Sequence, residues 1–109
     1  MATVYMKPQL GAVSGTQTRT GAGEINATLI CTEYVSTGAA QALTIEDGYN
    51  DGQMKYIMHV TDGGSGVLTG AKLAGTSVTF TDDGEGCTLR WSATQDKWYV
   101  VGTNAVFVV

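Results

Sequence analysis

The sequence has little charge, and the charge it has is not clustered. Only 15% of the 109 residues are charged, against roughly 25% in typical soluble domains. The six basic residues stand singly, whereas proteins that bind nucleic acids group lysine and arginine to neutralise phosphates. We therefore expect no nucleic-acid partner. A small protein with so few charges is expected to cover part of its surface with another protein.

Long apolar runs are also missing. No stretch approaches the roughly 20 apolar residues of a membrane-spanning helix, and residues 1–8 lack the apolar core of a signal peptide. The sequence thus predicts no membrane partner and synthesis in the cytoplasm. Low charge combined with many β-branched residues also argues against disorder.

Residues that carry chemistry are scarce. His59 is the single histidine, and the sequence has no Cys-x-x-Cys pair with which it could build a metal site. The acidic turns at 46–51 and 82–85 supply the Asp-Gly pairs that tight hairpins need and lack the spacing of a calcium loop. We expect no catalytic residue, no metal and no cofactor. Cys31 and Cys87 are expected to be buried, reduced thiols on the apolar faces of their strands.

Glycine, threonine and alternating apolar residues are abundant. Short alternations separated by Gly and Asp turns predict seven to nine strands and an all-β fold, a small antiparallel β-sandwich or barrel of jelly-roll type. We interpret residues 25–109 as this domain, and residues 1–24 as an N-terminal arm, or an edge strand plus a loop. Within the arm, Thr3–Met6 is the expected edge strand. Gly11–Glu24 holds four glycines and is expected to be a loop or extended arm.

Strand parity predicts which side chains face the core. Between residues 25 and 35 the odd-numbered side chains, Cys31 among them, are expected inward, and Tyr34 is expected on the wetter face. In the strand expected at 53–61, His59 is also placed on the wetter face. Lys55 and Ile57 share the parity of His59, and Trp91 and Trp98 have inward parity in the last hairpin.

The final segment, AVFVV at 105–109, is apolar on both faces of the predicted strand. One of those faces would meet water in an open monomer, so we expect a neighbouring copy to cover it. Tyr99, in the hairpin with the two tryptophans, is a candidate platform for stacking a sugar or a base. The expected interface residues are Thr3, Val4, Tyr5, Met6, Val106, Phe107, Val108 and Val109.

Three segments carry a resemblance to a known group of proteins: GTSVTF at 75–80, GEGCTLRW at 84–91 and KWYVVG at 97–102. From about Leu43 to Gly102 the chain resembles a recurrent module of tailed-phage virion proteins. Such modules occur in head-decoration, head-fibre and tail-fibre domains, which are usually trimeric β-structures. The resemblance does not cover residues 1–24, and it brings no catalytic residues.

The resemblance implies a non-enzymatic virion structural protein. The first expectation is a decoration or cement protein on the phage capsid surface, a homotrimer that contacts the major capsid protein and bridges capsid subunits. A tail-fibre or adhesin subunit that binds a host-surface glycan is the alternative. A phage-encoded enzyme of unusual design is the rival class, and no active-site constellation in the sequence supports it.

Overall fold

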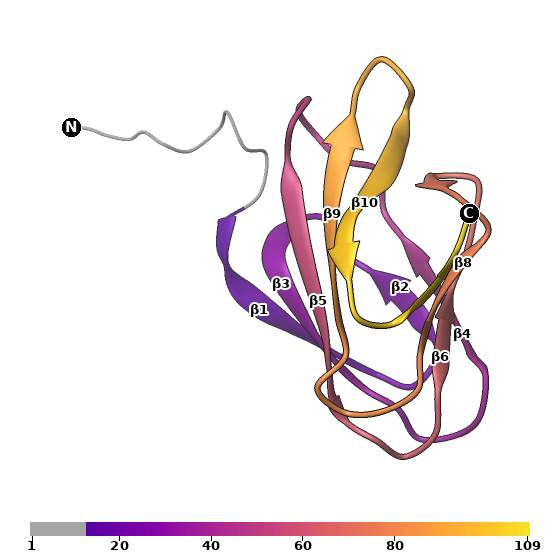
Figure 1. The fold of residues 1–109 in the computed structure, drawn as a ribbon. Coiled ribbons are helices and arrows are strands. Elements are labelled where there is room, and N and C mark those ends of the chain that lie inside the picture. The colour runs from indigo at the N-terminus through magenta and orange to yellow at the C-terminus, as the bar shows by residue number, and fades with distance from the viewer. Residues whose placement is uncertain (1–12) are drawn as a thin grey trace.

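Residues 13–109, which the computed structural model describes, are all β (Figure 1). The described part contains no helix, and so none that could cross a membrane. This confirms the predicted fold class, although eleven strands replace the seven to nine expected. The strands are β1 (Val13–Thr20), β2 (Gly23–Ile25), β3 (Leu29–Val35), β4 (Gln41–Ile45), β5 (Met54–Thr61), β6 (Gly66–Leu68), β7 (Leu73–Ala74), β8 (Ser77–Phe80), β9 (Gly86–Ser92), β10 (Lys97–Thr103) and β11 (Val106–Val108).

Two sheets enclose the core. A six-stranded sheet has the order β1-β3-β5-β9-β10-β7, and a five-stranded sheet has the order β11-β8-β6-β4-β2. The first six strands alternate between the two sheets, so β1 to β6 form three turns of a coil. Each return lands beside the previous strand of the same sheet and parallel to it. Parallel neighbours need a crossover connection, and here a strand of the opposite sheet supplies it.

The second half of the chain closes the coil with antiparallel strands. β9 pairs with β5 and β10, while β8 pairs with β6 and β11, all antiparallel. Five of the nine strand pairings among residues 13–109 are nevertheless parallel. The expected antiparallel, jelly-roll-like arrangement is therefore wrong. Alternation in a sequence predicts strands and their two faces, but it says nothing about direction.

The segment expected to be an arm or loop, Gly11–Glu24, is a strand over most of its described length. β1 lies at the edge of the six-stranded sheet, parallel to β3. β1 has few apolar side chains to bury, and Gln17 holds it in place by hydrogen bonds. The Gln17 Oε1 accepts from the Asn26 N–H at 3.0 Å and from the Thr32 hydroxyl at 2.7 Å. The loop prediction is thus wrong for β1. The edge strand predicted at Thr3–Met6 lies outside the described residues.

Aromatic side chains mark the two ends of the core. At one end the rings of Tyr34 and His59 stack at 5.1 Å, with Phe80 against both. At the other end Trp91 and Trp98 meet edge to face at 5.4 Å. Both tryptophans are buried, which confirms their predicted inward parity.

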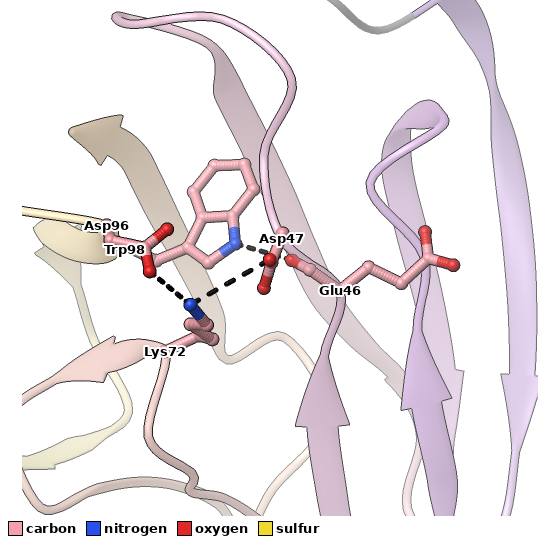
Figure 2. Close-up of polar contacts among 5 residues, drawn as sticks. All are labelled: Glu46, Asp47, Lys72, Asp96 and Trp98. Carbon is pink, nitrogen blue, oxygen red and sulfur yellow. Dashed lines mark hydrogen bonds and ion pairs between the residues drawn. The ribbon is translucent and has the colours of Figure 1, made fainter. Parts of the chain in front are cut away.

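The tryptophan end is held by contacts between loops (Figure 2). The Trp98 indole N–H donates to the Glu46 carbonyl oxygen at 2.7 Å. The Lys72 ammonium donates to the Asp96 carboxylate and lies 3.8 Å from that of Asp47. Gly48 passes so close to the Trp91 ring that a Cβ at this position would lie 2.3 Å from it, so only glycine fits there.

Candidate functional site

The outward side of β5 is apolar, and its inward side is largely polar. Lys55, Ile57 and His59 have no exposed surface, while Tyr56 and Met58 are 38% and 41% exposed. The prediction that His59 lies on the wetter face is therefore wrong. The physical reason is that both polar side chains find hydrogen-bond partners in the interior, which removes most of the penalty for burying them.

β3 shows the same reversal. Thr32 and Tyr34 are fully buried, whereas Cys31 and Glu33 are half-buried on the opposite side. The expectation that odd-numbered residues here face the core is wrong. The Tyr34 hydroxyl donates to the Gln41 amide oxygen at 2.7 Å, which satisfies it inside the fold, and burial raises the pKa of this phenol.

His59 belongs to a buried hydrogen-bond network, which we call the His59 network. Its Nδ1 lies 2.9 Å from the Asp82 carbonyl oxygen, so this nitrogen carries the proton and donates. Its Nε2 lies 2.8 Å from the Ser36 hydroxyl, which in turn accepts from the Gly63 N–H at 2.9 Å.

The serine and the histidine of this network are 2% and 0% exposed. Their third partner is a backbone carbonyl rather than a carboxylate. A substrate has no route to this pair, and what the pair does in the fold is to join three connections at one end of it. Sequence analysis missed the contact because Ser36 lies 23 residues before the histidine.

The outward side of the six-stranded sheet presents an apolar surface, which we call the outer face. Its charged side chains are Glu33, Arg90 and Lys97, and Arg90 Nη2 lies 3.6 Å from the Asp51 carboxylate. Soluble monomers rarely leave large apolar patches of this kind in water. The apolar members of the outer face are Cys31, Tyr56, Met58, Val60, Tyr99 and Val101.

A shallow groove of about 570 Å³ crosses the outer face. Tyr56, Met58 and Cys31 contribute to it from the sheet, and Asn104 contributes from the connection between β10 and β11. The Asn104 amide is already engaged, since its oxygen accepts from the Gly86 N–H at 2.7 Å and its nitrogen donates to the Gly84 carbonyl. The groove therefore offers an apolar contact surface with few free polar groups.

Tyr99, the predicted stacking residue, does lie exposed on β10. It pairs across the strands with Arg90 and is not part of the groove lining. Tyr56, which sequence analysis did not select, is the aromatic side chain in the groove. By strand parity it lies on the side of β5 opposite His59, and His59 was predicted to face outward.

β11 exposes valines at the edge of the five-stranded sheet. Val106 and Val108 are 58% and 48% exposed, and Val109 follows them in the open. Phe107 points the other way and packs against the core, where a Cβ on Gly75 would meet its ring at 2.7 Å. Of the predicted interface residues in this strand, the valines are free to meet a partner and Phe107 is largely occupied.

The two cysteines are free thiols in different settings. Cys87 is buried, as expected, and burial raises its pKa to about 11, with a hydrogen bond to Thr103 as a smaller opposing effect. Cys31 is half-buried on the outer face, so the prediction that it packs in the core is wrong. β5 lies between the strands that carry them.

The chain matches no family model, and no curated protein matches it significantly. Within residues 13–109 no group of three or more His, Cys, Asp or Glu side chains is placed to hold a metal ion. The outer face and the β11 edge are therefore the features on which a functional argument can be built.

Proposed function

We propose that this protein is a non-enzymatic virion structural protein that decorates a phage capsid and bridges its subunits. The observation that carries the proposal is the outer face, on which Tyr56, Met58 and Val60 are each about two-fifths exposed. A surface of this composition favours burial against another protein. The resemblance of residues 43–102 to phage virion modules supplies the proposed partner, the major capsid protein.

The β11 edge is proposed as the contact between copies. Edge strands leave backbone N–H and C=O groups unpaired, and proteins usually cover or charge them. Here the exposed side chains of the edge are uncharged valines. A homotrimer closes such contacts around a symmetry axis, and its number of copies rests on the resemblance.

Quantitative mass spectrometry of purified virions tests the location. Many copies per particle, released together with the head, are the expected result. A few copies per particle, associated with the tail, would favour the adhesin alternative, in which the groove beside Tyr56 holds part of a host-surface glycan. Absence from the particle would overturn both proposals.

Two variants separate the proposed surfaces. Met58→Lys places a charge on the outer face and is expected to abolish binding to particles that lack the protein, while the trimer remains in native mass spectrometry. Val106→Lys at the edge is expected to yield monomers. Thr94→Lys, in the exposed turn between β9 and β10, is the matched control and should change neither result. Unchanged particle binding by Met58→Lys would contradict the assignment of the outer face.

A further inference from the structure

Lys55 is a buried lysine whose amine meets an asparagine. Its side chain has no exposed surface, and its Nζ lies 2.8 Å from the Leu29 carbonyl oxygen and 3.4 Å from Asn26 Oδ1. None of the ion pairs among residues 13–109 includes it. A lysine held in the interior without a paired carboxylate is unusual, and its neighbours are groups with which an amine can react.

The backbone of Leu29 holds both groups. Its carbonyl accepts from the Lys55 amine, and its N–H donates to Asn26 Oδ1 at 3.2 Å. A backbone N–H on the side-chain carbonyl oxygen draws electron density from its carbon and would stabilise negative charge on that oxygen during attack. The backbone of one residue thus positions the nucleophile and polarises its target.

Glu46 supplies a proton acceptor close enough for its charge to act on Lys55, although its carboxylate lies beyond the 4 Å of an ion pair. Its Oε1 accepts from the N–H of Ala27, the residue after Asn26, at 2.8 Å. Burial lowers the pKa of Lys55 to about 8, against smaller opposing effects of Cys31 and Glu46. At pH 7 roughly one lysine in ten would then be the neutral, nucleophilic amine, and lysines activated by burial are established nucleophiles.

We propose that Lys55 and Asn26 form an internal amide cross-link. Glu46 takes a proton from the Lys55 ammonium, and the neutral Nζ attacks Cγ of Asn26. The new Cγ–Nζ bond forms, and Nζ then gives up a second proton through Glu46. Both protons pass to the departing Nδ2 as the Cγ–Nδ2 bond breaks, so this nitrogen leaves as ammonium and Glu46 is again a carboxylate. The reaction needs no oxidant, reductant or further reactant.

The cross-link would join two turns of the coil covalently. Asn26 follows β2 in the first turn of the coil, and Lys55 lies on β5 in the third. A covalent bond between them would connect the turns at one end, where the loops are otherwise held by hydrogen bonds and ion pairs. This inference does not depend on the proposed virion role.

Intact-mass spectrometry of the purified full chain tests the cross-link. The expected mass is lower than that of the sequence by about 17 Da, the mass of ammonia. Lys55→Arg and Glu46→Gln are expected to show their full sequence masses. Glutamine at position 46 can still accept from the Ala27 N–H but cannot take up the proton. Lys97→Arg and Glu24→Gln, both at exposed positions, are the controls and should keep the deficit.

Asn26→Asp sharpens the test, because its reaction would release water and give a product of the same mass as the natural chain. Tandem mass spectrometry should find the two peptides joined through residues 26 and 55. A full sequence mass for the natural chain would overturn the proposal. So would a deficit that persists in Lys55→Arg, because asparagine can also lose ammonia by cyclising onto its own backbone. Circular dichroism of each variant confirms that it is folded.

Discussion

β5 and β9 are hydrogen-bonded neighbours in one sheet, yet they distribute their side chains in opposite ways. β9 turns Cys87, Leu89 and Trp91 inward and Thr88 and Arg90 outward. β5 turns Lys55 and His59 inward and Tyr56 and Met58 outward. The first arrangement follows from hydrophobicity alone. The second depends on hydrogen-bond partners inside the fold and leaves an apolar surface outside.

The difference shows that hydrogen-bond partners elsewhere in the fold help to decide which side chains of a strand face the core. The alternation of apolar and polar residues within the strand does not decide it alone. Buried polar groups cost little when they are hydrogen-bonded and much when they are not. Lys55 has the Leu29 carbonyl, and His59 has Ser36 and the Asp82 carbonyl. With these contacts in place, the apolar side chains of β5 are available for another protein.

The largest effect is expected from placing a charge on the two sides of β5 in turn. Ile57→Lys would bury an ammonium without a partner and lower the free energy of unfolding by about 4–5 kcal/mol, which is enough to unfold many domains of this size. Met58→Lys, one residue away on the outer face, should cost no more than about 1 kcal/mol. Urea unfolding followed by circular dichroism measures both. A folded Ile57→Lys variant beside an unfolded Met58→Lys variant would mean that β5 faces the other way.

The next effect comes from the His59 network. His59→Leu keeps the side chain apolar and bulky but leaves the Ser36 hydroxyl and the Asp82 carbonyl without the imidazole. We expect a loss of about 3 kcal/mol, since buried polar groups are left unsatisfied.

A double-mutant cycle with Ser36→Ala gives the control for this prediction. The sum of the stability losses of the two single variants should exceed the loss of the double variant, because each single variant already removes the contact between His59 and Ser36. Additive losses, or a loss below about 1 kcal/mol for His59→Leu, would show that the His59 network contributes little to turning His59 toward the core.

A smaller effect, a loss of stability at alkaline pH, is expected from Cys87 on the inward side of β9. Because burial raises the pKa of Cys87 from 9.0 to about 11, the unfolded chain releases this proton first. The contribution of the thiol is complete below pH 9 and is lost as the pH rises to 11, by about 2 kcal/mol. Cys87→Ala should lose correspondingly less stability over that range in urea titrations. Tyr34 also has a raised pKa, but it titrates in both proteins and cancels in the difference. Equal losses of stability at alkaline pH in the natural chain and in Cys87→Ala would contradict the burial of Cys87.

What the sequence predicts well in this molecule is local. The Gly and Asp turns, the all-β class, and the inward facing of Trp91 and Trp98 follow from patterns a few residues long. For β11 the sequence predicted two apolar faces, one of which would meet water, but not that the exposed face would be that of the valines.

What the sequence does not reveal depends on contacts between distant segments. The inward facing of His59 needs Ser36, 23 residues earlier, and the Asp82 carbonyl, 23 residues later. β1 forms from a polar, glycine-containing stretch because β3 lies beside it and Gln17 bonds to Asn26 and Thr32. The parallel winding of the first six strands leaves no mark on alternation, because both directions alternate alike.

The smallest effect is expected from reduction, which should leave the melting temperature unchanged. Cys31 and Cys87 lie on opposite faces of one sheet with β5 between their strands. Two strand spacings place their Cα atoms about 10 Å apart, beyond the roughly 7 Å that a disulfide spans. In the folded protein a thiol reagent should label Cys31 on the outer face quickly, and Cys87 only after unfolding. A lower melting temperature in reductant would require a disulfide and therefore a different facing of β3. Equal labelling rates would mean that the contrast between the outer face and the inward side of β9 is not maintained in solution.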